Sequence, residues 1–442
     1  MEVRMANEVK ITVVVPVHNS EKYLKECLES ALSQSFKDIE ILCIDGGSKD
    51  ASFEIIKKIQ EKDDRIVYIS DSDTGYGHKL NIGIGKARGK YISILESDDR
   101  MGIEMLERLY EIAQQYDADI VDADYYNFFN HGGKEYFERV IKYSKLDCYN
   151  HLINFADFAE KEIVTSGIWT ALYRKEFLEQ QNIYLNESEG ASYQDASFLF
   201  LTSILAKNVY HLSIPLYQYR VDNVGSSVKD DRKIFEIIYE MEFLKNDLEK
   251  RDIHDQSVWK LYYIRKYNAF YWNYCRLSPH SKEIFLKEYL KELELDIQRG
   301  VINRENFTGS LYERTFLIID SKENFINKVI EKEGQTWQEK FCKLLDLIRS
   351  YKVVIFGVGM IGTRLVGMLQ QNEGRICGIC DNSSSLQGTK NNQYMVCSVK
   401  EAVERFKDAL YIITCREHSD EMKRQLIREG IKETNIIIFG DK

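Results

Sequence analysis

The sequence predicts an α/β protein with a parallel sheet covered by helices on both faces, a helical middle region and a second, smaller α/β domain. Short apolar runs alternate with helically spaced segments over the N-terminal part of the chain, and short connections join them. Charged and aromatic helical patterns follow, and the strand–helix alternation restarts near Lys352. We therefore expect domain divisions at 1–228, 229–349 and 350–442.

The first series of elements can be read in chain order. β-branched and apolar runs predict strands, and apolar residues at intervals of three and four predict the helices between them. The expected strands are 9–17, 39–44, 65–70 and 91–95, and the expected helices are 23–34, 53–60 and 79–87. Because each strand is followed by a helix, parallel pairing is expected.

Acidic residues stand where three of these strands end. Asp45 and Asp71 follow the second and third strands, and Glu96, Asp98 and Asp99 follow the fourth. The carboxyl ends of parallel strands meet at one edge of a sheet, where ligands of open α/β sheets bind. Clustered carboxylates repel one another unless a cation neutralises them. Mg²⁺ and Mn²⁺ prefer oxygen ligands and commonly bridge protein carboxylates to phosphates. A metal–diphosphate site is one interpretation, and acids that cap the following helices are the other.

Composition limits the class of protein. The chain has 442 residues and a formal net charge of −10, which argues against general nucleic-acid binding. Its nine cysteines are odd in number and irregularly spaced, as expected for reduced thiols. Neither a signal peptide nor an apolar run long enough to cross a membrane is evident. We expect a soluble, cytoplasmic protein; contact with the inner face of the membrane and a homo-oligomer both stay open.

Four ordered motifs resemble those of the inverting family-2 glycosyltransferases, which have the GT-A (nucleotide-diphospho-sugar transferase) fold. They are VVVPVHNSEKYLKECLESALSQSF, ILCIDGGSKDAS, NIGIGKARGKYISILESDD and YQD, and the match covers about the first 225 residues. Two positions depart from the common pattern. Asp45-Gly46 stands where an acidic pair is usual, and Glu96 stands where an Asp usually leads the metal motif.

The resemblance implies metal-dependent, inverting transfer of a sugar from a nucleotide diphosphate, with a UDP-sugar as the expected donor. The acceptor would be a hydroxyl of a glycan, a lipid-linked sugar or a glycoprotein. A divalent ion, Mn²⁺ or Mg²⁺, would stabilise the departing diphosphate, and Asp99 is the implied metal ligand. The implied donor-binding residues are Pro16, His18, Asn19, Glu21, Asp45, Asp71, Lys79, Asp98 and Arg220.

On the acceptor side, the resemblance implies a base and an aromatic contact. Asp195 matches the family's general base, which takes the proton of the attacking hydroxyl. Its alternative role is a helix N-terminal acid favoured by the helix dipole. Trp169 is the implied acceptor contact, with core packing as its alternative, and a salt bridge is the alternative role of Arg220.

A second candidate site lies near the C-terminus. Gly357, Gly359 and Gly362 form a GxGxxG after a strand and before a helix, and Asp381 follows the next strand. Three interpretations stay open: nucleotide or nucleotide-sugar binding, a structural or oligomerising module, and NAD redox chemistry. For the whole chain, the alternatives to a glycosyltransferase are an NAD-dependent sugar-nucleotide dehydrogenase or epimerase and a non-catalytic nucleotide-sugar-binding scaffold.

Overall fold

The computed structural model describes most of the chain, and its described parts form two compact units. The described residues are 8–71, 75–143, 147–160, 167–190, 192–223, 225, 233–305, 307–330, 336–372, 375–415 and 418–439. The first unit consists of Met1–Asn127 and Val140–Ile326, and the second of Phe128–Arg139 and Asn327–Lys442. Each unit is described by itself below.

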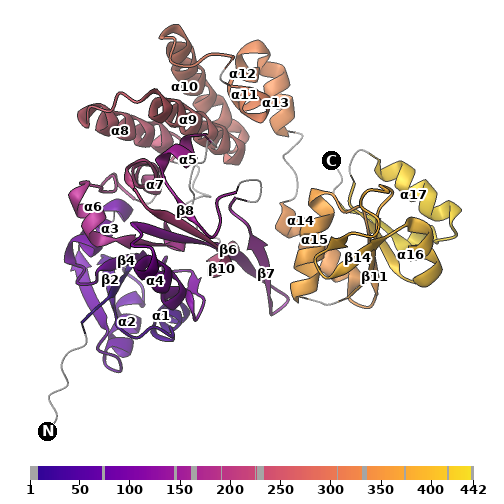
Figure 1. Ribbon diagram of the computed structural model, residues 1–442, viewed down its shortest axis with the longest axis horizontal. Coiled ribbons are helices and arrows are strands. Elements are labelled where there is room, and N and C mark those ends of the chain that lie inside the picture. The colour runs from indigo at the N-terminus through magenta and orange to yellow at the C-terminus, as the bar shows by residue number, and fades with distance from the viewer. Residues whose placement is uncertain are drawn as a thin grey trace. The chain divides into compact units, whose positions relative to one another are not determined.

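A ten-stranded sheet organises the described residues of the first unit (Figure 1). Its strand order is β3-β2-β1-β4-β9-β6-β10-β5; β7 pairs with β6 and β8 with β10. Strands β3, β2, β1 and β4 run parallel, and β9 joins β4 antiparallel. The predicted parallel sheet is thus confirmed, with an antiparallel extension. The strands are β1 Ile11–Val17, β2 Ile39–Gly46, β3 Ile66–Asp71, β4 Tyr91–Ile94, β5 Arg100–Met101, β6 Ile120–His131, β7 Lys134–Val140, β8 Leu152–Ile153, β9 Ala171–Arg174 and β10 Val209–Arg220.

Helices cover both faces of the parallel strands, as predicted. Val13 and Val15 of β1 pack in one buried cluster with residues of α1, α2 and α4. On the other face α3 lies directly on β1, because a Cβ added at Gly83 would lie only 2.2 Å from Val14 Cγ1. This glycine therefore permits the close approach of helix and strand. The helices are α1 Leu24–Leu32, α2 Ser52–Gln60, α3 Tyr76–Lys86, α4 Met105–Gln115, α5 Phe155–Glu160, α6 Lys175–Gln180 and α7 Gln194–Leu205.

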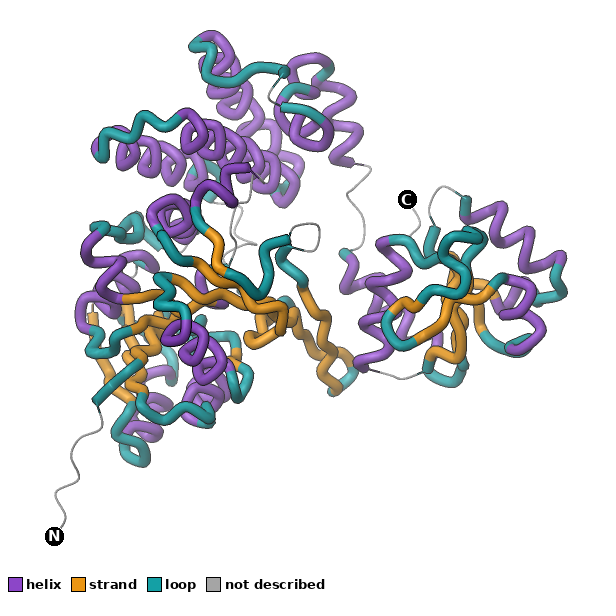
Figure 2. Tube along the Cα trace, in the orientation of Figure 1, coloured by secondary structure: helices purple, strands orange, loops and turns teal. Residues whose placement is uncertain are grey.

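The middle of the chain is helical, as predicted (Figure 2). Its long helices pack around buried aromatic rings, and Lys266 forms a buried ion pair with Asp296. No helix among the described residues combines the length and the apolar content needed to cross a membrane. The helices are α8 Glu236–Lys250, α9 Gln256–Arg276, α10 Pro279–Gln298, α11 Gly309–Thr315, α12 Leu317–Asp320, α13 Lys322–Ile330 and α14 Trp337–Ile348.

The second unit contains the predicted smaller sheet, with strand order β13-β14-β12-β11-β15-β16. Its elements are β11 Val353–Phe356, α15 Met360–Asn372, β12 Ile376–Cys380, β13 Lys390–Asn391, β14 Tyr394–Cys397, α16 Val399–Arg405, β15 Leu410–Ile413, α17 Ser419–Arg428 and β16 Ile436–Ile438.

Residues Phe128–Arg139, which contain the end of β6 and nearly all of β7, also belong to the second unit. Phe341 of α14 packs edge-on against Phe129 and Tyr136. Asn372 of α15 exchanges two hydrogen bonds with the backbone of Phe137, at 2.9 and 3.0 Å. The sequence pattern did not predict this association.

Candidate active site

Polar loops follow β1 and β2 and are tied together by hydrogen bonds. The ring nitrogen Nδ1 of His18 lies 2.8 Å from the Gly46 carbonyl oxygen. The Asn19 amide donates to Ser48 Oγ at 2.9 Å, and Asn19 Oδ1 accepts from the Lys49 amide at 2.8 Å. Pro16 lies within β1, beside Ile44 of β2, and is buried. The predicted donor-side residues Pro16, His18 and Asn19 are therefore brought to one edge of the sheet.

Asp45 is the buried acid of this edge, with 3% of its surface exposed. Its Oδ1 accepts from the Ser48 amide at 2.9 Å and from Ser48 Oγ at 2.6 Å. Its Oδ2 accepts from the Tyr68 hydroxyl at 3.1 Å. Glu21, by contrast, accepts from the Ala51 amide at 2.9 Å and so joins the first loop to the start of α2. Both acids help to shape the loops that would surround a donor.

The acidic loop after β4 joins the same edge. Ser20 Oγ lies 2.7 Å from Ser97 Oγ, which connects the loop after β1 to the loop after β4. Burial, reinforced by the charges of Asp98 and Asp195, raises the pKa of Glu96 to about 8, against the opposing hydrogen bond from Tyr76. The carboxylates of this loop are therefore crowded, and a cation placed among them would be stabilised.

Asp98 and Asp99 differ in their surroundings. Asp99 is fully buried; its Oδ1 accepts from the Arg220 amide at 2.7 Å, and its Oδ2 accepts from the Tyr217 hydroxyl at 2.9 Å. Burial and the Asp98 charge raise the pKa of Asp99 well above its usual range. Asp98 is only half-buried, and its Oδ2 accepts from Asn223 Nδ2 at 2.7 Å. Asp98 is thus the more accessible of the two carboxylates.

Arg220, the predicted diphosphate clamp, makes extensive contacts within the protein. Its Nε donates to the Asp98 carbonyl oxygen at 2.9 Å, and Nη2 pairs with Glu26. Its guanidinium lies 4.1 Å from the centroid of the Tyr23 ring. These contacts hold the acidic loop against α1, so the ion-pair alternative describes what Arg220 does in this structure. Its role toward a diphosphate stays a prediction.

The two remaining donor-side predictions lie at α3 and β3. Lys79 is buried, and its charge lowers the pKa of Glu96, which burial raises. Asp71, the last residue of β3, pairs with His78 at 3.6 Å. Lys79 thus lies close to the acidic loop, and Asp71 faces the start of α3.

The carboxylates of the acidic loop suit a divalent cation that is bound partly by the protein and partly by a phosphate. Asp98 and Glu96 supply oxygen donors in a locally negative environment. In the described part of the chain, no three His, Cys, Asp or Glu side chains are grouped so as to hold a metal by themselves. Mg²⁺ is often held by one or two carboxylates, with water and substrate phosphates completing the shell. The donor set therefore suits a metal that arrives with a diphosphate.

Asp195 lies in the first turn of α7, within reach of the positive charge of Arg265 on α9. Burial raises its pKa, and the charge of Arg265 opposes that effect. Glu240 of α8 is also buried and accepts from the Ser197 amide at 3.1 Å. Because the Asp195 charge also raises the pKa of Glu96, the predicted base and the acidic loop lie within electrostatic reach of each other.

Trp169 is half-buried in an aromatic stack. Its ring lies parallel to that of Tyr219, with centroids 5.0 Å apart, and packs against Tyr217 with centroids 4.4 Å apart. Tyr217 also donates to Asp99. Trp169 therefore adjoins the acidic loop through Tyr217, and its part in acceptor binding stays a prediction.

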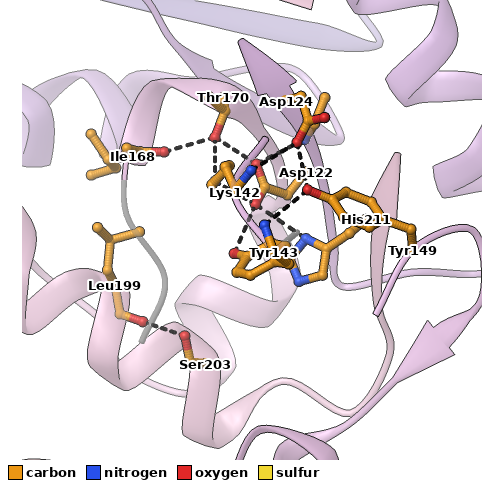
Figure 3. Close-up of polar contacts among 12 residues, drawn as sticks. Asp122, Asp124, Lys142, Tyr143, Tyr149, Ile168, Thr170, Leu199, Ser203 and His211 are labelled. Carbon is orange, nitrogen blue, oxygen red and sulfur yellow. Dashed lines mark hydrogen bonds and ion pairs between the residues drawn. The ribbon is translucent and has the colours of Figure 1, made fainter. Parts of the chain in front are cut away.

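A buried polar cluster secures the turn that carries Trp169 (Figure 3). Asp122 of β6 accepts from Lys142 Nζ at 2.6 Å and from Thr170 Oγ1 at 2.5 Å. His211 Nδ1 lies 3.1 Å from Asp122 Oδ2. Burial alone would raise the pKa of Asp122, but Lys142 and His211 hold it well below its usual range. Sequence reasoning missed this cluster, whose members are far apart in the chain.

The C-terminal glycine loop is closely packed. Gly357 has φ 103°, and a Cβ at Gly362 would lie 1.9 Å from the Gly357 carbonyl oxygen. Asp381 accepts from the amides of Val358 and Ser383, each at 2.8 Å. A Cβ added at Gly359 would have no neighbouring atom within 4 Å. The loop thus has the predicted strand–turn–helix form, with Asp381 bracing it, and its ligand stays open.

Comparisons with known proteins agree with the geometry. The profile described as "Glycosyl transferase family 2" matches residues 12–180, and the profile "C2185-like, N-terminal" matches residues 349–437. Glycosyltransferase GlyG of Streptococcus pneumoniae is 31% identical over 229 residues, covering 48% of this chain and 70% of GlyG. The chain belongs to glycosyl transferase family 2.

Other relatives match over smaller shares of their length. Glycosyltransferase GlyA of Streptococcus pneumoniae is 33% identical over 220 residues, which span 48% of this chain but only 30% of GlyA. The crystal structure of S. aureus TarS has a TM-score of 0.52 at 17% identity, covering 74% of this chain and 56% of TarS. This likeness concerns the fold. The predicted architecture, a GT-A-like sheet with a helical middle and a small second sheet, is confirmed.

Proposed function

We propose that this protein transfers a sugar from a nucleotide diphosphate to an acceptor hydroxyl, with inversion at the sugar and with a divalent metal. One observation carries the proposal: the Tyr76 hydroxyl donates to Glu96, and the Tyr76 amide donates at 2.8 Å to the carbonyl oxygen of Gly190, five residues before Asp195. These contacts support a single site that contains both the acidic loop and the candidate base. That loop also adjoins the polar edge formed by β1 and β2. Membership of the family and relatives named as glycosyltransferases support it.

On this proposal each group has one task. The loops around Asp45 and Asn19 would hold the nucleotide. Asp99 is the implied metal ligand, but both its oxygens accept hydrogen bonds from the protein, so the metal contact is proposed for the neighbouring Asp98, with Asp99 fixing the loop behind it. A bound Mn²⁺ or Mg²⁺ would stabilise the negative charge of the departing diphosphate. Asp195 would accept the proton of the attacking hydroxyl, a contribution of about 10²–10⁴ in rate. Its raised pKa makes it a stronger base than an exposed Asp.

The donor is proposed to be a UDP-sugar, and the acceptor a glycan, lipid-linked sugar or glycoprotein. Trp169 would contact the acceptor. The division into 1–228, 229–349 and 350–442 is proposed as the functional organisation, in which the glycine loop of the last part binds a nucleotide or serves assembly.

The first experiment screens nucleotide sugars for release of free nucleotide by the full chain, with Mn²⁺, with Mg²⁺ and with EDTA. We expect metal-dependent release from at least one UDP-sugar. Asp195→Asn should abolish release while nucleotide affinity stays within a few-fold of wild type. Asp420→Asn is the matched control, since Asp420 is an exposed acid in the first turn of another helix, α17.

Four results would contradict the proposal or part of it. Full turnover by Asp195→Asn would show that Asp195 is not the base, and release unaffected by EDTA would show that the reaction needs no metal. A saturable response to NAD, with no release from any nucleotide sugar, would favour the dehydrogenase or epimerase alternative. Nucleotide-sugar binding without turnover would favour a scaffold.

A further inference from the structure

A tyrosine with an unusual backbone conformation stands two residues before Asp195. Tyr193 has φ 66° and ψ −1°, the left-handed region that bulky side chains rarely adopt. Its carbonyl oxygen accepts from the Ala196 amide at 2.8 Å, so the same turn begins α7. The direction in which Asp195 leaves the helix therefore depends on this turn.

Side chains of α9 hold the tyrosine in place. The Tyr193 hydroxyl donates to Asn273 Oδ1 at 2.6 Å and accepts from Arg276 Nε at 2.8 Å. Arg276 Nε also donates to Asn273 Oδ1 at 3.0 Å, and Asn273 Nδ2 donates to the Ile234 carbonyl oxygen at 2.9 Å. The Trp272 ring meets the Tyr193 ring edge-on, with centroids 5.9 Å apart. Asn273 is fully buried, so this network is not a loose surface contact.

A second contact holds the same turn of α7 from α8. Glu240 accepts from the Ser197 amide at 3.1 Å and from Asn186 Nδ2 at 2.9 Å. Arg265 of α9 faces the charges of both Asp195 and Glu240. The first turn of α7 is thus fixed by contacts from two helices of the middle region, α8 and α9. A strained backbone conformation persists at a functional site when the surrounding contacts hold it in place. The contacts from α8 and α9 do this for the turn at Tyr193.

We propose that Tyr193 is a positioning residue for Asp195, and that α8 and α9 thereby complete the active site. This rests on the proposed function, in which Asp195 is the base. The hydroxyl contacts with Asn273 and Arg276 impose the left-handed turn, and the turn aims the carboxylate at the acceptor. The middle region then serves catalysis as well as packing.

The test compares Tyr193→Phe with Tyr262→Phe in the full chain. The Tyr262 hydroxyl also makes one buried hydrogen bond from α9, to the Met241 carbonyl oxygen at 3.0 Å, so its loss controls for stability alone. The readout is nucleotide release from the best UDP-sugar of the screen. We expect Tyr193→Phe to lower kcat at least about tenfold, since small misplacements of a reacting group cost about that much or more. KM for the donor should change less than about twofold, because the donor side is untouched.

A pH profile separates positioning from a loss of folded protein. Burial raises the pKa of Asp195, so a carboxylate released toward water should have a lower pKa. The acid limb of kcat/KM should therefore move to lower pH in Tyr193→Phe and stay in place in Tyr262→Phe. The titratable groups whose charges reach Asp195 are Tyr76, Glu96, Tyr173, Tyr193, Glu240 and Arg265.

The outcomes are distinct. If Tyr193→Phe matches Tyr262→Phe in kcat and in its acid limb while Asp195→Asn is inactive, the positioning role is overturned and the base remains. If Asp195→Asn has wild-type turnover, Asp195 is not the base, and both the proposed mechanism and the positioning role of Tyr193 are wrong. A tenfold loss of kcat with a shifted acid limb, confined to Tyr193→Phe, supports the positioning role.

Discussion

Lys142→Met should destabilise the protein strongly, because it leaves a buried carboxylate without its main partner. The Lys142 and Asp122 side chains are only 3% and 5% exposed, and their charged atoms lie 2.6 Å apart. Removing one member of a buried ion pair costs about 3–5 kcal/mol. At about 2–4 °C per kcal/mol for a large domain, the melting temperature should fall by about 6–20 °C.

The loss of stability in Lys142→Met should depend on pH. In the wild type the pKa of Asp122 is held below its unfolded-state value, so the group contributes stability at neutral pH that is lost as the pH falls through the folded-state pKa. Without Lys142, His211 is left to oppose the effect of burial, so we expect the pKa of Asp122 to rise above its unfolded-state value and stability to be lost as the pH rises. His211, whose pKa burial and Lys142 lower, would become easier to protonate, which acts in the same direction. The deficit of Lys142→Met should be larger at about pH 8 than at about pH 5.5.

Thermal unfolding of the full chain at both pH values measures the effect. Lys245→Met is the control, because the Lys245–Glu249 pair lies at 3.1 Å on a helix surface. An exposed pair of this kind contributes at most about 1 kcal/mol. The reasoning is refuted if Lys142→Met is no less stable than Lys245→Met, or if its deficit grows as the pH falls.

Three further outcomes are expected. Asp98→Ala should weaken Mn²⁺-dependent nucleotide binding at least about tenfold in calorimetry, whereas unchanged binding would remove it from the metal site. Asp99→Ala should lower the melting temperature, because two buried donors lose their acceptor at about 1–3 kcal/mol each, and a wild-type melting temperature would contradict this. Gly362→Ala should lower the unfolding temperature of the second unit in calorimetry, because its Cβ would lie 1.9 Å from the Gly357 carbonyl oxygen; an unshifted transition would refute the clash.

The order of the N-terminal elements was predictable because local chemistry determines it. β1 and β2 are unbroken runs of buried, largely apolar and β-branched residues, and helical spacing separates them. Acids directly after such strands must lie at one sheet edge, which is why Asp45 and the loop at Asp98 were foreseen together. The helix expected at 79–87 begins earlier, at Tyr76, because a polar first turn carries little periodic signal.

The contacts that complete the site were not predictable from local patterns. Tyr217 reaches Asp99 across 118 residues, and Asn372 meets Phe137 across 235 residues. A tyrosine in an aromatic run has no local feature that distinguishes a core ring from a hydrogen-bond donor to a buried acid. The left-handed turn at Tyr193 was equally hidden, because such turns are usually marked by Gly, Asn or Asp.

The pair Asp98-Asp99 shows how adjacent, identical side chains come to differ. The two residues lie in the turn after β4, where the Asp99 amide donates to the Glu96 carbonyl oxygen at 3.1 Å, and only the Asp99 side chain is fully buried. The buried one, Asp99, is acceptable in the interior only because two donors meet its two oxygens, one of them the backbone amide of Arg220. That bond ties the acidic loop to the end of β10, and the Arg220 side chain ties it again through the Asp98 carbonyl oxygen. The carboxylate of Asp98 is therefore presented from a loop held at two points. Since a rigid carboxylate loses less conformational entropy on binding a cation than a mobile one, Asp99 and Arg220 would favour binding of the proposed metal by holding Asp98 in place.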